Sequence, residues 1–114
     1  MNIKLKRAYE EADSSDGIRI LVERLWPRGV TKTAAALDHW FKDIAPSPEL
    51  RKWFAHRRER WSEFQKRYRA ELTQNGQQVA DLRAICSKGT VTFVFAARDT
   101  ARNGAVVLKK YLES

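Results

Sequence analysis

Residues 90–97, Thr-Val-Thr-Phe-Val-Phe-Ala-Ala, constrain the fold of this chain more than any other stretch. They are rich in β-branched and aromatic residues, which favour a strand. Toward the end of the run, apolar side chains occupy both faces of that strand. A strand that is apolar on both faces is typical of the centre of a sheet in an α/β protein. We therefore predict that residues 91–96 form a central strand with helices on both sides.

Two earlier segments predict further strands, and the rest of the chain has helical patterns. Residues 3–7 alternate apolar and basic side chains, and residues 18–25 form a second apolar run. The direction of the first strand relative to the second stays open, because the linker between them is short for a crossover. The expected fold is a small single α/β domain over residues 1–114, with a short, mostly parallel sheet of about three strands flanked by helices.

The helices are predicted from caps and apolar stripes. Thr31 or Thr33 can cap a helix that continues to about Ile44, and Ser47 with Pro48 begins the next one. A capping box at residues 62–65 predicts the start of a third helix, which Asn75-Gly76 interrupts. Two more helices are expected, over residues 77–88 and 101–112.

Charge and cysteine content narrow the classes of function. The chain has a net charge of +8 and a pI near 10.0, which favours anionic partners. It has one cysteine, Cys86, and no metal-ligand spacing, so no metal or cofactor is expected. No segment resembles an export signal or a membrane span, and we predict a cytoplasmic protein without a membrane partner. The sequence leaves the oligomeric state open.

Two polar turns follow predicted strands and form the first candidate site. Residues 24–29, Arg-Leu-Trp-Pro-Arg-Gly, follow one strand, and residues 98–103 follow another. If these strands are parallel and adjacent, both turns lie at the edge of the sheet where α/β proteins bind ligands. Arginine forks and the N-terminus of the last helix would favour phosphate, a nucleotide group or a carboxylate. The predicted ligand-binding residues are Arg24, Trp26, Arg28, Arg98, Asp99 and Asn103.

A structural interpretation of the same residues stays open beside this one. Trp26 could fill the edge of the core, and Asp99 could cap the last helix while pairing with a structural arginine. An enzyme that uses Asp99 with the arginines is a further alternative. No serine or cysteine nucleophile stands beside a base, and neither His39 nor His56 is a convincing catalytic base.

The basic stretch of residues 51–69 offers an alternative function. It contains eight basic and two acidic residues, interleaved with aromatic ones, as in some surfaces that bind single-stranded nucleic acid. Helical spacing instead places Phe64 and Tyr68 toward the core, so we expect weak, non-specific binding at most. The candidate nucleic-acid-binding residues are Arg51, Arg57, Arg58, Lys66 and Arg69.

Several motifs together resemble the YeaO-like family, bacterial proteins grouped under a domain of unknown function (DUF488). The resemblance spans nearly the whole chain, and residues 24–29 are its most specific block. It leaves the activity open. Relatives often have histidine where this chain has Gly104, and Asp-Pro where it has Arg57 and Arg58. The other motifs that carry the resemblance are residues 15–21, Leu37-Asp38 with Trp40, Ser47, Leu50-Arg51, Trp61, Phe64, Arg67-Tyr68, Glu71-Leu72, Ala97-Arg98-Asp99, Asn103 and Ala105.

Overall fold

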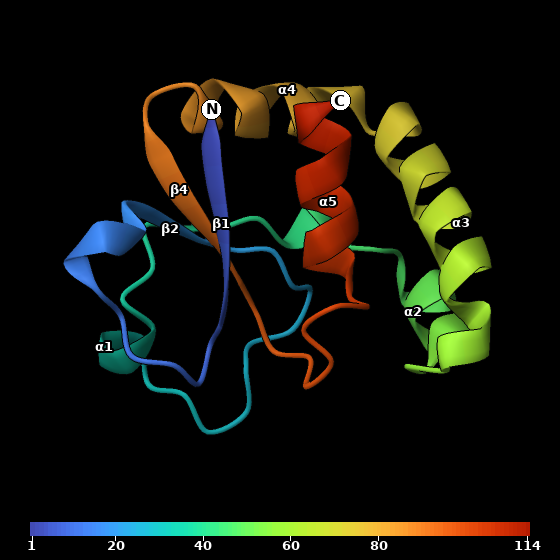
Figure 1. Cartoon of the computed structure of the whole chain (residues 1–114), viewed down its shortest axis with the longest axis horizontal. Helices are drawn as coiled ribbons and strands as arrows, with labels where there is room; N and C mark the ends of the chain where they lie inside the picture. The colour runs from blue at the N-terminus through green and yellow to red at the C-terminus, as the bar shows by residue number, and fades with distance from the viewer.

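The computed structural model describes the whole chain, residues 1–114, and contains one parallel sheet. Its strands lie in the order β1-β4-β2-β3, so β4 is central, as the sequence predicts (Figure 1). All three pairs of neighbouring strands are parallel, and the sheet has four strands rather than about three. The strands are β1 (Asn2–Arg7), β2 (Ile18–Leu21), β3 (His39–Trp40) and β4 (Thr90–Phe95).

Four helices lie on one side of the sheet, and the last of them, over residues 104–113, packs directly against β1 and β4. Their apolar stripes join side chains such as Ile20, Val91 and Phe93 in one large core, which makes these three side chains completely buried. The start of α2 confirms the sequence signal, because the Ser47 side chain accepts a hydrogen bond from the Leu50 amide and Pro48 follows it. None of these helices is long and apolar enough to cross a membrane. The helices are α2 (Pro48–Phe54), α3 (Trp61–Gln74), α4 (Gly76–Cys86) and α5 (Gly104–Glu113).

The second face of the sheet is covered by loops and by two one-turn helices, η1 (Ser14–Asp16) and α1 (Lys32–Ala35). A helical layer on this side, which the two-faced β4 predicts, does not form. The apolar part of this layer is small: Leu21 and Val94 pack against half-buried side chains of the loop that follows β2. The rest of the layer is polar, which explains why short segments suffice to cover it.

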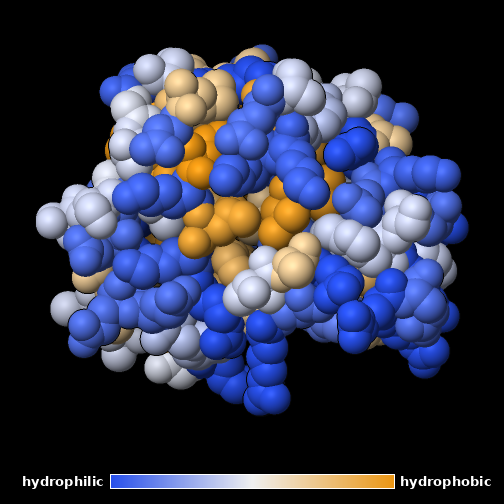
Figure 2. All heavy atoms as spheres, viewed as in Figure 1, coloured by the Kyte–Doolittle hydropathy of each residue, from blue (hydrophilic) through white to orange (hydrophobic).

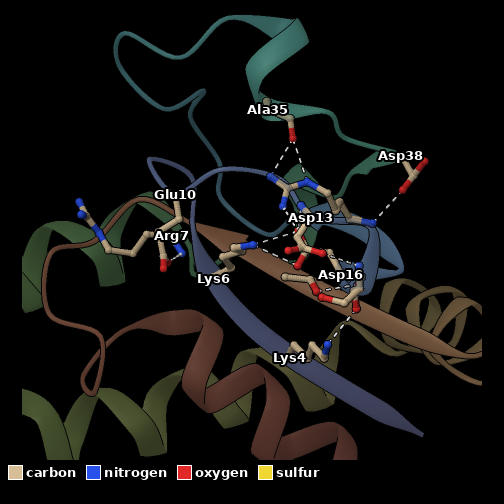
Figure 3. A network of polar contacts seen from close by, with 11 residues as sticks. Lys4, Lys6, Arg7, Glu10, Asp13, Asp16, Ala35 and Asp38 are labelled. Atoms are coloured by element: carbon tan, nitrogen blue, oxygen red, sulfur yellow. Dashed lines mark hydrogen bonds and ion pairs between the residues drawn. The ribbon is translucent and has the colours of Figure 1, made fainter.

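A buried ion-pair network occupies the polar half of this layer (Figure 3). Arg19 Nη1 lies 2.6 Å from Asp16 Oδ2, and the same guanidinium donates two hydrogen bonds to the carbonyl oxygen of Ala35. Lys6 also pairs with Asp16, at 3.1 Å. Burial opposes ionisation of Asp16, but hydrogen bonds from the Asp13 backbone, Lys6 and Arg19 hold the pKa of Asp16 below its usual value.

The predicted helix over residues 31–44 is wrong beyond its first turn. Thr31 caps α1 as expected, but Ala36 adopts a left-handed conformation and the chain then forms β3. Trp40 is therefore not part of a buried helical stripe; it lies in an edge strand and donates a hydrogen bond to the carbonyl oxygen of Glu23. Pairing with β2 competes with helix formation here, and the segment supplies the fourth strand.

One expectation about the start of a helix needs correction, and the structure decides the strand direction that the sequence left open. Helix α3 begins at Trp61 after Arg60, and no side chain caps it, so Ser62 is inside the helix rather than its cap. The segment between β1 and β2 does cross the sheet, because β4 lies between these parallel strands. Gly17 permits this crossing: its φ is +66°, and an added Cβ would lie 2.1 Å from the Thr90 carbonyl oxygen.

Candidate functional site

A cavity of about 630 Å³ lies at the carboxyl ends of β2 and β4. The sequence predicted that the two polar turns share one edge of the sheet if the strands before them are parallel and adjacent. These two strands, β2 and β4, are parallel and adjacent. Residues 22–28 form one wall, residues 96–99 and the start of α5 form another, and α2 with its C-terminal turn closes the third. All six residues predicted for the ligand site line this cavity: Arg24, Trp26, Arg28, Arg98, Asp99 and Asn103.

Arg24 is held by the protein itself. Its guanidinium donates to the carbonyl oxygens of Ala45 and Pro46, at 3.1 and 3.4 Å, and lies 3.8 Å from the carboxylate of Asp43. These bonds tie the loop after β2 to the segment that leads into α2. Asp99, which the structural interpretation paired with an unnamed arginine, makes no ion pair with Arg24. Arg24 therefore shapes the wall of the cavity more than it offers a free charge.

Trp26 also has a structural role, as the alternative interpretation expected. Its indole Nε1 donates to the carbonyl oxygen of Val30 at 2.7 Å, which closes the turn after the buried Pro27. Its ring meets the ring of Trp40 edge to face, with centroids 5.4 Å apart. Such aromatic pairs add to the stability that burial provides. The hydrogen bond to Val30 and the contact with Trp40 together hold the Trp26 side chain, and with it the loop, in one conformation.

Asp99 and Asn103 organise the turn that leads into α5. Asp99 Oδ1 accepts hydrogen bonds from the amides of Ala101 and Arg102, which together with the Arg102 guanidinium lower the pKa of Asp99. Asn103 caps α5 by accepting from the Val106 amide. The cap is thus Asn103 rather than Asp99, and the arginine that pairs with Asp99 is Arg102. Both side chains are engaged locally.

Three other arginines line the cavity without a partner for their guanidinium groups. They are Arg28, Arg51 and Arg98, and all three are exposed. None of their side chains makes a hydrogen bond or an ion pair. Arg28 and Arg51 form hydrogen bonds only through their backbone atoms. The sequence placed Arg28 and Arg98 here but assigned Arg51 to the basic surface. Helix α2 brings it to the cavity because Leu50 and Phe54 are buried in the core.

A carboxylate and an imidazole of the cavity, Glu23 and His56, were not predicted from the sequence. Glu23 ends the extended segment after β2, and its Oε1 accepts a hydrogen bond from the Ala96 amide at 3.0 Å. Burial raises the pKa of Glu23, while that hydrogen bond and the charges of His56 and Arg51 act in the opposite direction. A charged residue at the end of an apolar run was the signal for Glu23. His56 gave none.

His56 reaches the cavity through an unusual turn. Ala55 and His56 follow α2 with φ values of +47° and +55°, a left-handed conformation that costs non-glycine residues free energy. This turn ends the helix and places the His56 ring 5.8 Å from the ring of Phe54, at the cavity wall. Strained backbone of this kind often occurs at functional sites.

The basic stretch of residues 51–69 divides into parts with different surroundings. Its aromatic residues belong to the core: Phe54, Phe64 and Tyr68 are buried, as helical spacing predicted. Trp53 is half-buried, and the guanidinium groups of Arg60 and Arg67 lie over its ring, so the ring is already in contact with cationic groups of the protein. Four of the five candidate nucleic-acid-binding residues lie outside the cavity and are exposed: Arg57, Arg58, Lys66 and Arg69. They form a solvated surface without an aromatic platform.

Comparisons with known proteins support the resemblance seen in the sequence. A family model described as "Inactive DUF488-N3 subclade" (DUF488-N3i) matches residues 2–114. The uncharacterised protein YeaO of Escherichia coli is 47% identical over 114 residues, which cover 100% of this chain and 99% of that protein. An uncharacterised protein of Mycobacterium tuberculosis is 43% identical over 110 residues, which cover 96% of this chain and 92% of that protein. No solved structure matches the chain.

Proposed function

The chain belongs to the DUF488 family, in the subclade described as inactive, and we propose that it binds a small organic anion in the cavity at the ends of β2 and β4. One observation carries the proposal: Arg28, Arg51 and Arg98 line one cavity, and none of their guanidinium groups has a hydrogen-bond or ion-pair partner in the protein. Elsewhere in the same chain, the buried guanidinium of Arg19 is fully engaged. Free guanidinium groups in a concave site are suited to carboxylate or phosphate.

The shape and lining of the cavity favour a ligand with an apolar part. Its volume, about 630 Å³, lies within the range of small-molecule sites. Ten of its 21 lining residues are hydrophobic, among them Val22, Phe54 and Phe64. The positive end of the α5 dipole is at the same wall, since Gly104 and Ala105 also line the cavity. An anionic head with an aliphatic or aromatic body fits this combination best.

Binding fits the chain better than catalysis does. The family description calls the subclade inactive. Asp99, the carboxylate that the sequence suggested for an enzyme, is engaged by backbone amides and by Arg102. Backbone amides and Arg102 also lower the pKa of Asp99, which makes this carboxylate a weaker general base.

The test is ligand-induced stabilisation in the wild-type protein and in matched variants. We expect adenosine monophosphate or 3-phenylpropionate to raise the Tm more than inorganic phosphate does, because both have an apolar body. Arg28→Ala and Arg98→Ala should each weaken binding by roughly tenfold to a hundredfold, the value of one charge-assisted hydrogen bond of about 1.5–3 kcal/mol. Their intrinsic stability should change by less than about 0.5 kcal/mol, because both side chains are exposed.

Arg69→Ala is the control for net charge. It removes the same charge from an exposed position on α3 that does not line the cavity. We expect this variant to bind organic anions as the wild type does. Equal loss of binding in Arg28→Ala and Arg69→Ala would mean that the anions respond to overall charge, and the proposed site would be wrong.

A second candidate function is weak, non-specific binding of nucleic acid by the exposed residues Arg57, Arg58, Lys66 and Arg69. The observation in its favour is that all four side chains are exposed, in a chain of net charge +8. Affinity for a random-sequence oligonucleotide should then fall steeply with salt, and reversal of Lys66 and Arg69 to Glu should abolish it. Sequence-selective binding at physiological salt would contradict this expectation.

A further inference from the structure

Glu23 is the one carboxylate of the cavity that the local structure uses only in part. One oxygen, Oε1, accepts the Ala96 amide at 3.0 Å, and this bond joins the ends of β2 and β4. The backbone of Glu23 is fixed as well, because its carbonyl oxygen accepts from the Trp40 indole at 2.7 Å. The side chain is therefore held in one place at the cavity, beside the arginines.

The other oxygen of Glu23, Oε2, has no hydrogen-bond partner in the protein. It is not sealed in the interior either, because no side-chain oxygen or nitrogen of the chain is both buried and unpaired. The open space beside Glu23 is the cavity. A carboxylate oxygen accepts hydrogen bonds and cannot donate them when ionised. Oε2 is thus an acceptor without a protein partner, on a side chain that lines the proposed ligand site and is held there by the bond of Oε1.

Glu23 also forms no ion pair with the positively charged groups around it. His56 and Arg51 are near enough to act on its charge, yet no arginine, lysine or histidine lies within ion-pair distance of its carboxylate. If Glu23 served only to neutralise the cavity arginines, a direct pair with one of them would be expected. Asp99, by contrast, does form an ion pair, with Arg102, which does not line the cavity.

We propose that the ligand of this cavity is amphoteric: it has an anionic group for Arg28, Arg51 and Arg98, and an amino or amidine group whose N–H donates to Glu23 Oε2. This inference rests on the proposed function, because it names the class of anion that the site selects. An α-amino acid with an apolar side chain and an aminoalkyl phosphate are representative of the class. Selectivity arises because an anion that lacks the donor leaves the acceptor of Glu23 unpaired when it displaces water from the cavity.

The experiment compares pairs of probes that differ by one amino group. The pairs are L-phenylalanine with 3-phenylpropionate, and 2-aminoethyl phosphate with ethyl phosphate, titrated calorimetrically at pH 7.5. We expect the wild-type protein to bind the amino member of at least one pair ten times more tightly or better. Glu23→Gln should reduce that ratio to about twofold, while its affinity for the member without an amino group stays within about threefold of wild type.

Two variants separate the contributions. Glu49→Gln makes the same charge change at an exposed position of α2 outside the cavity, and it should keep the wild-type ratio. Arg28→Ala should weaken both members of a pair together. A fold check by circular dichroism applies to each variant, and Glu23→Gln can still accept the Ala96 amide through its side-chain oxygen.

The outcomes distinguish this inference from the proposal beneath it. If both members of each pair bind equally, depend on Arg28 and do not respond to Glu23→Gln, the site binds simple anions and the amphoteric ligand is refuted. If none of the four probes binds and none of the anions used above stabilises the protein, the anion site itself is refuted, and this inference with it.

Discussion

Arg19 and Arg28 belong to the two polar regions of this protein, and their guanidinium groups have opposite surroundings. Arg19 is 3% exposed and is bonded to Asp16 and to the carbonyl oxygen of Ala35. Arg28 is exposed at the cavity, and its guanidinium has no protein partner. The first region stabilises the second face of the sheet. The second region is left available to something outside the chain.

The difference gives a criterion for choosing which arginines to propose as ligand contacts and which to regard as structural. Arg24 has a place in the cavity wall, but its bonds to the carbonyl oxygens of Ala45 and Pro46 make it resemble Arg19. Lining the cavity is therefore weaker evidence that an arginine contacts a ligand than the absence of hydrogen-bond partners for its guanidinium group. A buried polar group without partners is costly, so groups that fold the protein are satisfied within it. The polar side chains of the cavity that have no hydrogen-bond partner in the protein are the candidates for ligand contacts.

The largest expected effect comes from breaking the ion-pair network of Asp16, Lys6 and Arg19 on the second face of the sheet. Arg19→Ala should destabilise the protein by about 3–5 kcal/mol, since it leaves a buried carboxylate with one partner fewer. Urea denaturation at pH 7 measures this change, with Arg28→Ala as the matched variant in the other region, expected within about 0.5 kcal/mol. Similar losses for both variants would contradict the division into two regions.

The same network should make stability fall in acid. The pKa of Asp16 is lowered in the folded state, so its contribution is present above the usual pKa of 3.8 and is lost as the pH falls below that value. In Arg19→Ala the part of this loss that comes from Asp16 should be smaller. Denaturation curves measured between pH 7 and pH 2.5 for both proteins give the comparison.

A smaller effect is expected from the rigid loop beside the cavity. Trp26→Ala should cost about 3 kcal/mol, at the lower end of the range for a large aromatic residue, because the side chain is only half-buried. Trp26→Phe keeps most of the apolar contact and loses the bond to Val30, which should cost about 1 kcal/mol. If Trp26→Ala were as stable as wild type, the ring would be a surface group available for ligand contact.

The turn after α2 should respond in the opposite direction. His56→Gly is expected to stabilise the protein by about 1 kcal/mol, because glycine adopts a φ of +55° without strain. The same substitution should weaken the binding of anions, since it removes a cationic or donor group from the cavity wall. A variant that is less stable than wild type would show that the imidazole contributes packing that outweighs the strain.

The smallest effect comes from Glu23. Burial raises the pKa of this carboxyl above 4.5, so its ionised form opposes folding at neutral pH. Glu23→Gln should be equally stable or more stable by less than about 1 kcal/mol at pH 7. That advantage should shrink as the pH falls through the pKa of Glu23, because protonation removes the cost in the wild type. A pronounced loss of stability at pH 7 would mean that Glu23 is structural.

The sequence by itself determined the elements that local chemistry specifies. The two-faced run of β4 predicted the centre of the sheet, Ser47 with Pro48 predicted the start of α2, and Asn75-Gly76 predicted the break between α3 and α4. Each of these signals depends on residues close to one another in the chain. For the same reason, the turns after β2 and β4 could be placed at one edge of the sheet once both strands were recognised.

Tertiary structure decided the features that depend on contacts between segments distant in the sequence: strand pairing, the partners of the arginines, and the residues that line the cavity. Residues 37–40 have a helical pattern, but pairing with β2 makes residues 39 and 40 a strand. Whether an arginine is free or engaged depends on carbonyl oxygens far away in sequence, as Arg24 and Ala45 show. Arg51 and His56 join the cavity only because the core residues of α2 orient that helix toward the strand ends. These outcomes depend on long-range contacts that no local pattern records.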